Sequence, residues 1–438
     1  MIKDKLNLPK VINATYKVIT PMFIGDAEQK VSWISPMSFK GALRFWWRAL
    51  AWGKIRLNPE YNSDELAMKE LHHQEALLFG SSAEIPKEYK IKDPNQFPKE
   101  RINYGKGSIK VDVIAKPLNN SDKQLKGSVH QKLKNYPASR YLGYGVIEAF
   151  ASKNKGISAG QLVRDCINEG KEFKVKIILD DSTKMEEIKQ ALILMGLLGG
   201  LGSKVRKGYG SIKLITLARE TAHKNETIWQ SPQDFLSYQK ELNKILTNAN
   251  KLAEIPPFSA FSATTFITTT TVGQDIYQVL EDYGRAMIFY RSWGKNNKVL
   301  NQDSEKNFQK DHDWSKGEQV FKLNFPNDDY HKFHPERTIF GLPHSYGKQC
   351  SVVRDLKTNG DGRRASPLLF HVQEIGGKYY GIATLLKAQF LPKNEKIKAN
   401  KNLVEQNINW DILQAGFLAD KKRFPKSQVI FPLEISND

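Results

Sequence analysis

A glycine-rich, positively charged stretch at residues 196–214 carries the residue types best suited to holding an anionic backbone. It reads GLLGGLGSKVRKGYGSIKL. Glycine lets a ligand approach the main chain closely and leaves N–H donors accessible, and interleaved Lys and Arg side chains suit a phosphodiester. Tyr209 adds a stacking face or a hydroxyl group. The candidate contacts here are Gly200, Gly202, Ser203, Lys204, Arg206, Lys207, Gly208, Tyr209 and Gly210.

This stretch is not a nucleotide-binding P-loop. A P-loop follows a strand and opens a helix, with Lys and then Ser or Thr after its last glycine, whereas here the pattern predicts helix, loop and strand in that order. The alternative is a flexible connection whose charges only keep the protein soluble. Six glycines are entropically costly for a mere connector, which favours a function.

The segment SPMSFKGALRFWWRALAWGK at residues 35–54 predicts a helix with a basic face. Ser35 is a candidate N-cap, Pro36 suits the first helical position, and the helix should run to about residue 52. Lys40, Arg44 and Arg48 are four residues apart and therefore share one face. Such a row fits a phosphate backbone, although a core helix with a solvated outer face is the commoner outcome for this pattern.

A third basic site precedes a predicted strand near residue 366. Arg363 and Arg364 follow the turn-like sequence NGDG at residues 359–362. A second anion contact and an ordinary basic turn at the end of a sheet are equally compatible with this pattern.

No catalytic group or metal site emerges from the sequence. Metal-independent RNA cleavage needs a base and an acid beside one phosphodiester, and the segments 40–48 and 196–211 contain no His, Asp or Glu. His331 and His334 lie in a charged segment, where solvated histidines are far commoner than catalytic ones. Because His344 or His371 reaches the glycine-rich stretch only if the fold brings it there, we expect no enzyme activity, no cofactor and no metal.

Composition points to a polyanionic partner in the cytoplasm. The 438 residues carry a net charge of +19. Residues 1–225 contain 38 Lys/Arg and 23 Asp/Glu, a net +15, so the first half holds most of the excess. A lysine-rich proteome is the alternative explanation. Two distant cysteines argue against a disulfide framework, and no apolar run is long enough to cross a membrane.

The order of predicted elements indicates an α+β protein with two tandem ferredoxin-like domains and insertions. Strand, helix, strand and again strand, helix, strand are predicted at 11–20, 35–52, 108–117, 172–179, 182–198 and 211–217. A second unit begins near 258, with a strand at 264–272, a helix at 275–293, a hairpin at 366–390 and a last strand at 428–433. We place the domains at 1–225 and 226–438. Insertions are expected at 85–106 and, with many charges and little pattern, at 296–334.

Four segments resemble a known family. The N-terminal sequence TPMFIGDA…SPMSFKGALRFWWRAL is similar to the start of the first subunits of the Cmr complex, the type III-B CRISPR effector. GLGSKVRKGYGS resembles the glycine-rich loop of the RAMP superfamily, whose domains are ferredoxin-like and RRM-like. FGLPHSYG and RRASPL resemble C-terminal elements of the same first-subunit family.

The resemblance implies a non-catalytic RNA-binding subunit of an RNA-guided antiviral complex. Its partners would be other RAMP subunits, the guide RNA near its 3′ end and the paired target RNA, with target cleavage performed by a different subunit. The alternative from another class is a RAMP-fold endoribonuclease that processes guide RNA. The resemblance does not cover the two insertions.

Overall fold

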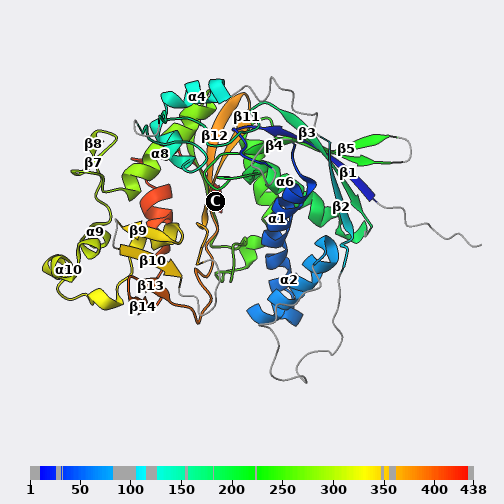
Figure 1. Ribbon diagram of the computed structural model, residues 1–438. Helices are drawn as coiled ribbons and strands as arrows, with labels where there is room; N and C mark the ends of the chain where they lie inside the picture. Colours follow the sequence, from blue (N-terminus) through cyan, green and yellow to red (C-terminus); the bar gives the residue numbers. More distant parts are fainter. Residues whose placement is uncertain are drawn as a thin grey trace, which may run out of the picture.

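The computed structural model describes residues 10–25, 31, 33–81, 105–114, 126–152, 156–180, 182–221, 224–346, 350–354 and 362–432 (Figure 1). The predicted insertion at 85–106 therefore lies almost entirely outside the described residues. Within them, no helix is long and apolar enough to cross a membrane.

The first sheet has five strands in the order β2-β3-β1-β4-β5. Every neighbouring pair is antiparallel. Helices connect β1 to β2 and β3 to β4, so the first four strands have the βαββαβ order of a ferredoxin-like unit. The strands are β1 (Lys10–Val18), β2 (Ile109–Ile114), β3 (Glu172–Leu179), β4 (Ile212–Glu220) and β5 (Asn225–Gln230).

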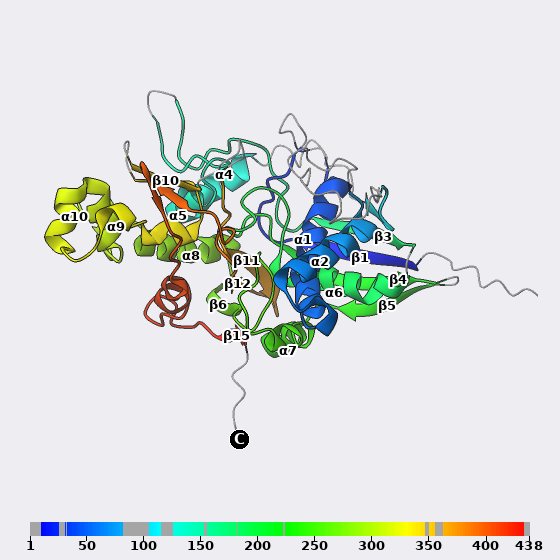
Figure 2. The ribbon, with the colours of Figure 1, turned by 90° about the horizontal axis from the view of Figure 1, so that it is seen from below.

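Helices cover one face of this sheet, and the residues on its other face are partly exposed. Helices α1 (Pro36–Arg56) and α6 (Met185–Leu198) pack on the sheet and on each other, and α2 (Asp64–Phe79) packs on α1 (Figure 2). In β1 every second residue from Ile12 to Val18 is buried, as expected for a strand with one covered face. The Ser35 hydroxyl accepts a hydrogen bond from the Met37 N–H, which confirms the predicted helix start.

The second unit repeats the same strand order in a shortened form. Its sheet runs β11-β12-β6-β15, and α8 (Ile276–Arg291) follows β6 as the first helix. The second helix is reduced to two short turns, Trp410–Ile412 and Gln414–Leu418, and β15 has only three residues. Two tandem ferredoxin-like units with insertions are therefore confirmed. The strands are β6 (Phe266–Gly273), β11 (Leu368–Ile375), β12 (Lys378–Leu385) and β15 (Val429–Phe431).

The second sheet is buried on both faces because the first unit packs against it. Phe370 and Val372 face the core around α8, whereas Leu369 and Ile382 join the core of the first unit, which includes α6. In Figure 1, β11 and β12 accordingly stand near the middle of the molecule. Helix α7 (Phe235–Ile245) contacts both α6 and β15. The domain boundary at 225/226 stays a prediction, although β5 pairs with β4 of the first sheet beyond it.

Segments from two separate insertions build a third sheet, in the order β14-β13-β10-β9. Strands β9 (His344–Tyr346) and β10 (Cys350–Arg354) precede β11, whereas β13 (Ile397–Ala399) and β14 (Asn402–Val404) follow β12. The segment 296–334, expected as a charged insertion, lies between α8 and β9 and has regular elements that its sequence did not reveal. That segment contains the two-residue strands β7 (Lys298–Val299) and β8 (Gln302–Asp303) and the helices α9 (Gln309–Lys316) and α10 (Glu318–Asn324), and it contributes buried Trp314 and Phe321 to a core of its own.

Candidate nucleic-acid interface

The glycine-rich loop, residues 199–211, lies at the seam between the two ferredoxin-like units. It connects α6 to β4 in the first unit and pairs with β11 of the second through a bridge between Lys207 and Phe370. The Phe370 N–H donates to the Arg206 carbonyl at 3.2 Å. Gly208 has φ +88°, and a Cβ there would come within 2.7 Å of the Phe370 ring. The loop is therefore packed between the units.

The glycines serve chain packing, which corrects the expectation of an open main-chain cradle. Gly200 and Gly210 are buried, and a Cβ on Gly200 would lie 2.3 Å from the Gly210 carbonyl. The N–H groups of Ser203, Gly208 and Gly210 donate to carbonyls of Phe23, Val205 and Pro21 within the protein. These three donors are therefore satisfied internally and are not available to an anion.

Tyr209 is fully buried, so it does not offer the exposed stacking face suggested by the sequence. Its hydroxyl donates to the Ser139 carbonyl at 2.9 Å, which fixes α5 (Pro137–Leu142) against the loop. Helix α8 holds the same helix, because the buried Glu281 carboxylate accepts hydrogen bonds from the Ala138 and Ser139 N–H groups, both at 2.8 Å. Burial raises the pKa of the Glu281 carboxyl. Tyr209 is therefore a positioning residue.

Cationic side chains from both units gather around the loop, and we call this group the seam cluster. Lys204, Arg206 and Lys207 come from the loop, and sequence reasoning found them. It missed Arg164 and Arg291, which carry no local motif and approach the loop only through the fold. Among the described residues, no carboxylate forms an ion pair with any of the six cations of this cluster. The members are Arg164, Lys204, Arg206, Lys207, Arg291 and Arg364.

Burial and the charges of neighbouring cations lower the pKa values of the loop cations. Desolvation, followed by the charges of Arg291, Lys204 and Arg206, lowers the pKa of Lys207 to about 7. Burial and then Arg364 lower the pKa of Arg206 to about 10. The Nε atoms of Arg164 and Arg291 are buried without a hydrogen-bond acceptor. An anion on the seam cluster would relieve both the repulsion and the missing acceptors.

Two members of the cluster also hold the protein together. Arg206 donates to the Ser366 carbonyl at 2.7 Å and lies over the Phe45 ring of α1 at 5.5 Å. Arg364 donates to the Phe390 and Gln389 carbonyls and lies over the Phe390 ring. Arg363 is exposed beside it. Lys204 and Lys207 are thus the members best able to turn to a ligand.

The predicted basic face of α1 is partly neutralised within the fold, because one carboxylate lies against two of its three cations. Arg44 Nε lies 3.0 Å from Glu75 Oε1, and Arg48 Nη1 lies 3.7 Å from Glu75 Oε2. Arg44 also donates to the Gly80 carbonyl at 2.6 Å. Lys40 is half-buried, and desolvation and then the Arg44 charge lower its pKa. The carboxylate comes from α2, which a spacing argument on α1 alone does not reveal.

Two histidines lie near the loop, but neither is tuned for proton transfer at neutral pH. Burial and then the charges of Arg291 and Arg337 lower the pKa of His344 to about 3. His371 is buried in β11, where desolvation lowers its pKa to about 4. General acid–base catalysis works best with pKa values near the working pH. Within the described residues there is also no cluster of side chains that suits a metal ion.

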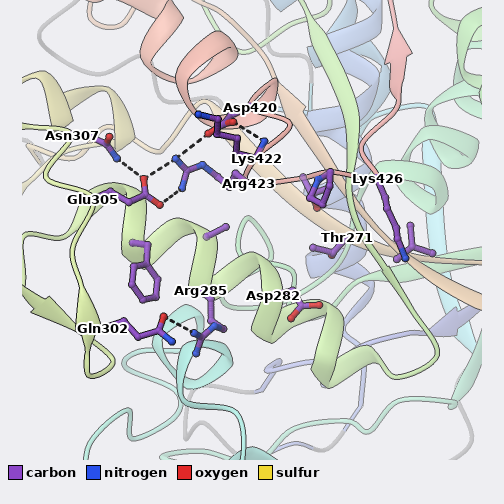
Figure 3. A pocket seen from close by; sticks show the side chains of 15 residues that line it. Thr271, Asp282, Arg285, Gln302, Glu305, Asn307, Asp420, Lys422, Arg423 and Lys426 are labelled. Atoms are coloured by element: carbon purple, nitrogen blue, oxygen red, sulfur yellow. Dashed lines mark hydrogen bonds and ion pairs between the residues drawn. The ribbon is translucent and has the colours of Figure 1, made fainter.

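A cavity of about 810 Å³ lies on the outer side of α8, away from these residues (Figure 3). Its lining has four basic and three acidic side chains, so most of the positive charge is offset. Arg423 binds both Glu305 oxygens at 2.6 and 2.8 Å, and Arg285 donates to Gln302 at 3.3 Å. Asp282 and Asp420 add negative charge. The cavity is therefore a weaker anion site than the seam cluster.

Comparison with known proteins recognises the first unit, including the glycine-rich loop. A family model described as the RAMP superfamily matches residues 15–213, a range that includes β1, α1, α6 and the glycine-rich loop. This region belongs to the RAMP superfamily. The predicted superfamily membership is thereby confirmed for the first ferredoxin-like unit. No curated protein matches the chain.

Two solved structures are similar to this chain over most of its length. The crystal structure of apo Cmr1 from Pyrococcus furiosus is 18% identical, with a TM-score of 0.49, covering 96% of this chain and 98% of that one. A chain in the cryo-EM structure of type III-B Cmr-beta bound to cognate target RNA is 13% identical, with a TM-score of 0.49, covering 93% and 98%.

Proposed function

We propose that this protein is a non-catalytic RNA-binding subunit of a cytoplasmic type III-B CRISPR effector, the Cmr complex. In this proposal it contacts the guide RNA near its 3′ end together with the paired target RNA, beside other RAMP subunits. The N-terminal motif resemblance and the RAMP membership of residues 15–213 support the choice of complex. The Lys204 and Lys207 side chains would bind phosphates of the RNA backbone.

The observation that carries the RNA part is the seam cluster. Six cations from two units converge without a carboxylate partner among the described residues, and burial and then neighbouring members of the cluster lower the pKa values of Lys204, Arg206 and Lys207. A fold gains nothing from such repulsion, whereas an RNA backbone supplies a row of negative charges at matching density. The internal bonds of the Ser203, Gly208 and Gly210 N–H groups support a contact made mainly by side chains.

The test is binding of fluorescently labelled single-stranded RNA to the purified full chain, measured by anisotropy over a salt series. We expect binding that weakens steeply with salt and depends little on sequence, because backbone contacts read no bases. Binding that is insensitive to salt, or confined to one unpaired sequence, would contradict the proposal.

The alternative of a guide-processing endoribonuclease is tested in parallel. One observation favours this alternative. The Nδ1 atom of His344 is buried without a hydrogen-bond partner, and the side chain lies close to Arg291. Its low pKa makes it a poor general base, so we expect intact repeat RNA after incubation with the protein, with or without divalent metal. Site-specific cleavage that is lost in His344→Ala would replace the binding-subunit proposal with the nuclease.

A further inference from the structure

The turn that follows α5 lies beside the seam cluster and carries one exposed aromatic side chain. Tyr144 is 65% exposed, yet the residues around it are firmly held. Val146 and Ile147 are buried, and their N–H groups both donate to the Gly143 carbonyl at 2.9 Å. A Cβ on Gly143 would lie 2.4 Å from the Ile147 side chain, so the turn closes tightly.

The same turn is fixed against the glycine-rich loop. A Cβ on Gly143 would lie 3.2 Å from the ring of Tyr209, the residue that anchors α5. A Cβ on Gly145 would lie 3.8 Å from Lys204 Nζ. Tyr144 thus stands between two residues that contact the loop, and its position does not depend on a flexible segment.

Two cations lie near the backbone of the turn that carries Tyr144. Lys204 lies beside Gly145, and Arg164 is close enough to Lys204 to lower its pKa. Arg164 Nη1 donates to the Ser203 hydroxyl at 3.4 Å, and its neighbour Val163 bonds to Val146 through their main chains. The Tyr144 ring itself has no aromatic neighbour among the described residues. The turn that carries the exposed Tyr144 ring therefore lies beside two cations of the seam cluster.

We infer that Tyr144 is a base-stacking residue, and that the RNA held by Lys204 and Arg164 is single-stranded at this point. The inference rests on the proposed RNA-binding function and adds that the bound RNA is single-stranded at this point. An exposed aromatic ring next to phosphate-binding cations is the usual platform for unpaired nucleotides, because any base offers a flat face to stack on. Bases inside an A-form duplex are already stacked on each other and do not reach such a ring.

The experiment compares Tyr144→Ala, Tyr144→Leu and Tyr144→Phe in the full chain. Binding is measured with a labelled single-stranded RNA and with the same RNA annealed to its complement. We expect Tyr144→Ala to weaken single-strand binding by roughly tenfold, within the range known for loss of one stacked base. Tyr144→Phe should bind as the wild type does, Tyr144→Leu should resemble Tyr144→Ala, and the salt slope should stay unchanged in all three. Duplex binding should change little.

Two controls separate this inference from the proposed function. Leu323→Ala removes an exposed apolar side chain on α10, 78% exposed, and should leave RNA binding unchanged. Lys204→Ala should reduce the salt slope. Wild-type affinity in Tyr144→Ala alongside a weakened Lys204→Ala would overturn the stacking role and leave the proposed function standing. Equal losses on single-stranded and duplex RNA would also overturn it, and a wild type that binds no RNA would end both.

Discussion

The cations of α1 and those of the seam cluster look alike in the sequence and differ in their surroundings. Arg44 and Arg48 share the Glu75 carboxylate of α2, so one of their two charges is offset inside the fold. Lys204 and Lys207 face other cations, and no carboxylate balances them among the described residues. Unbalanced charge is costly for folding, so the comparison indicates which of two basic segments is kept for a ligand.

The largest difference in RNA binding between the two segments should appear when each pair of cations is removed. Lys204→Ala with Lys207→Ala should reduce the magnitude of the salt slope by about 1.4, which corresponds to about 25-fold weaker binding at 0.1 M salt, because each lost phosphate contact removes about 0.7 from it. Arg206 is left in place because it braces Ser366. The matched control is Arg44→Ala with Arg48→Ala. If the control lost as much affinity as the test pair, the distinction between the two segments would be wrong.

The pH dependence of binding should follow Lys207. Its pKa of about 7 in the free protein rises when a phosphate binds, so binding takes up a proton. Affinity should therefore be highest below pH 7 and fall as pH rises through 7 and above, by up to about tenfold per pH unit. Anisotropy titrations at pH 6, 7 and 8.5 measure this, and Lys207→Met should lose most of the dependence. A flat profile in the wild type would argue against contact at Lys207.

The structural role of the α1 pair can be measured without RNA. In Glu75→Gln the two arginines lose their shared negative charge, while Arg44 keeps its bond to the Gly80 carbonyl. We expect a loss of about 1–2 kcal/mol in unfolding free energy, since the pair is only partly buried. Denaturant unfolding measures this loss. RNA affinity should stay within twofold of wild type, and a large change there would mean that α1 also contacts the ligand.

The smallest expected effect is a gain in stability. Because burial lowers the pKa of Lys207 below its unfolded value, the charged side chain destabilises the fold at low pH, and this cost fades as pH rises through 7 towards 10. Lys207→Met should therefore raise the free energy of unfolding by about 1 kcal/mol at pH 6 and by less at pH 9. A destabilised variant at pH 6 would show that Lys207 stabilises the fold and is not strained within it.

Local patterns were sufficient for the regular elements of this fold. The capping pair Ser35-Pro36 located the start of α1, and the alternation at residues 172–179 matched β3 to the residue. Contacts between residues distant in sequence could be found only in the three-dimensional structure. The Glu75 partner of Arg44, the approach of Arg291 to Lys207 and the burial of Tyr209 all depend on how separate elements meet. Tyr144 had the right chemistry, but only the packing of Gly145 on Lys204 gave it a role.

The third sheet has a consequence for how the chain is made. Its strands β9 and β10 lie before β11, while β13 and β14 lie after β12, and β13 pairs with β10. During synthesis the ribosome releases β10 well before β13, the strand that pairs with its second edge, exists. The nascent chain must therefore keep the edge of β10 and the apolar side of Val352 from associating with other chains until residue 404 has emerged. Release from a stalled ribosome before that point should yield an aggregation-prone fragment.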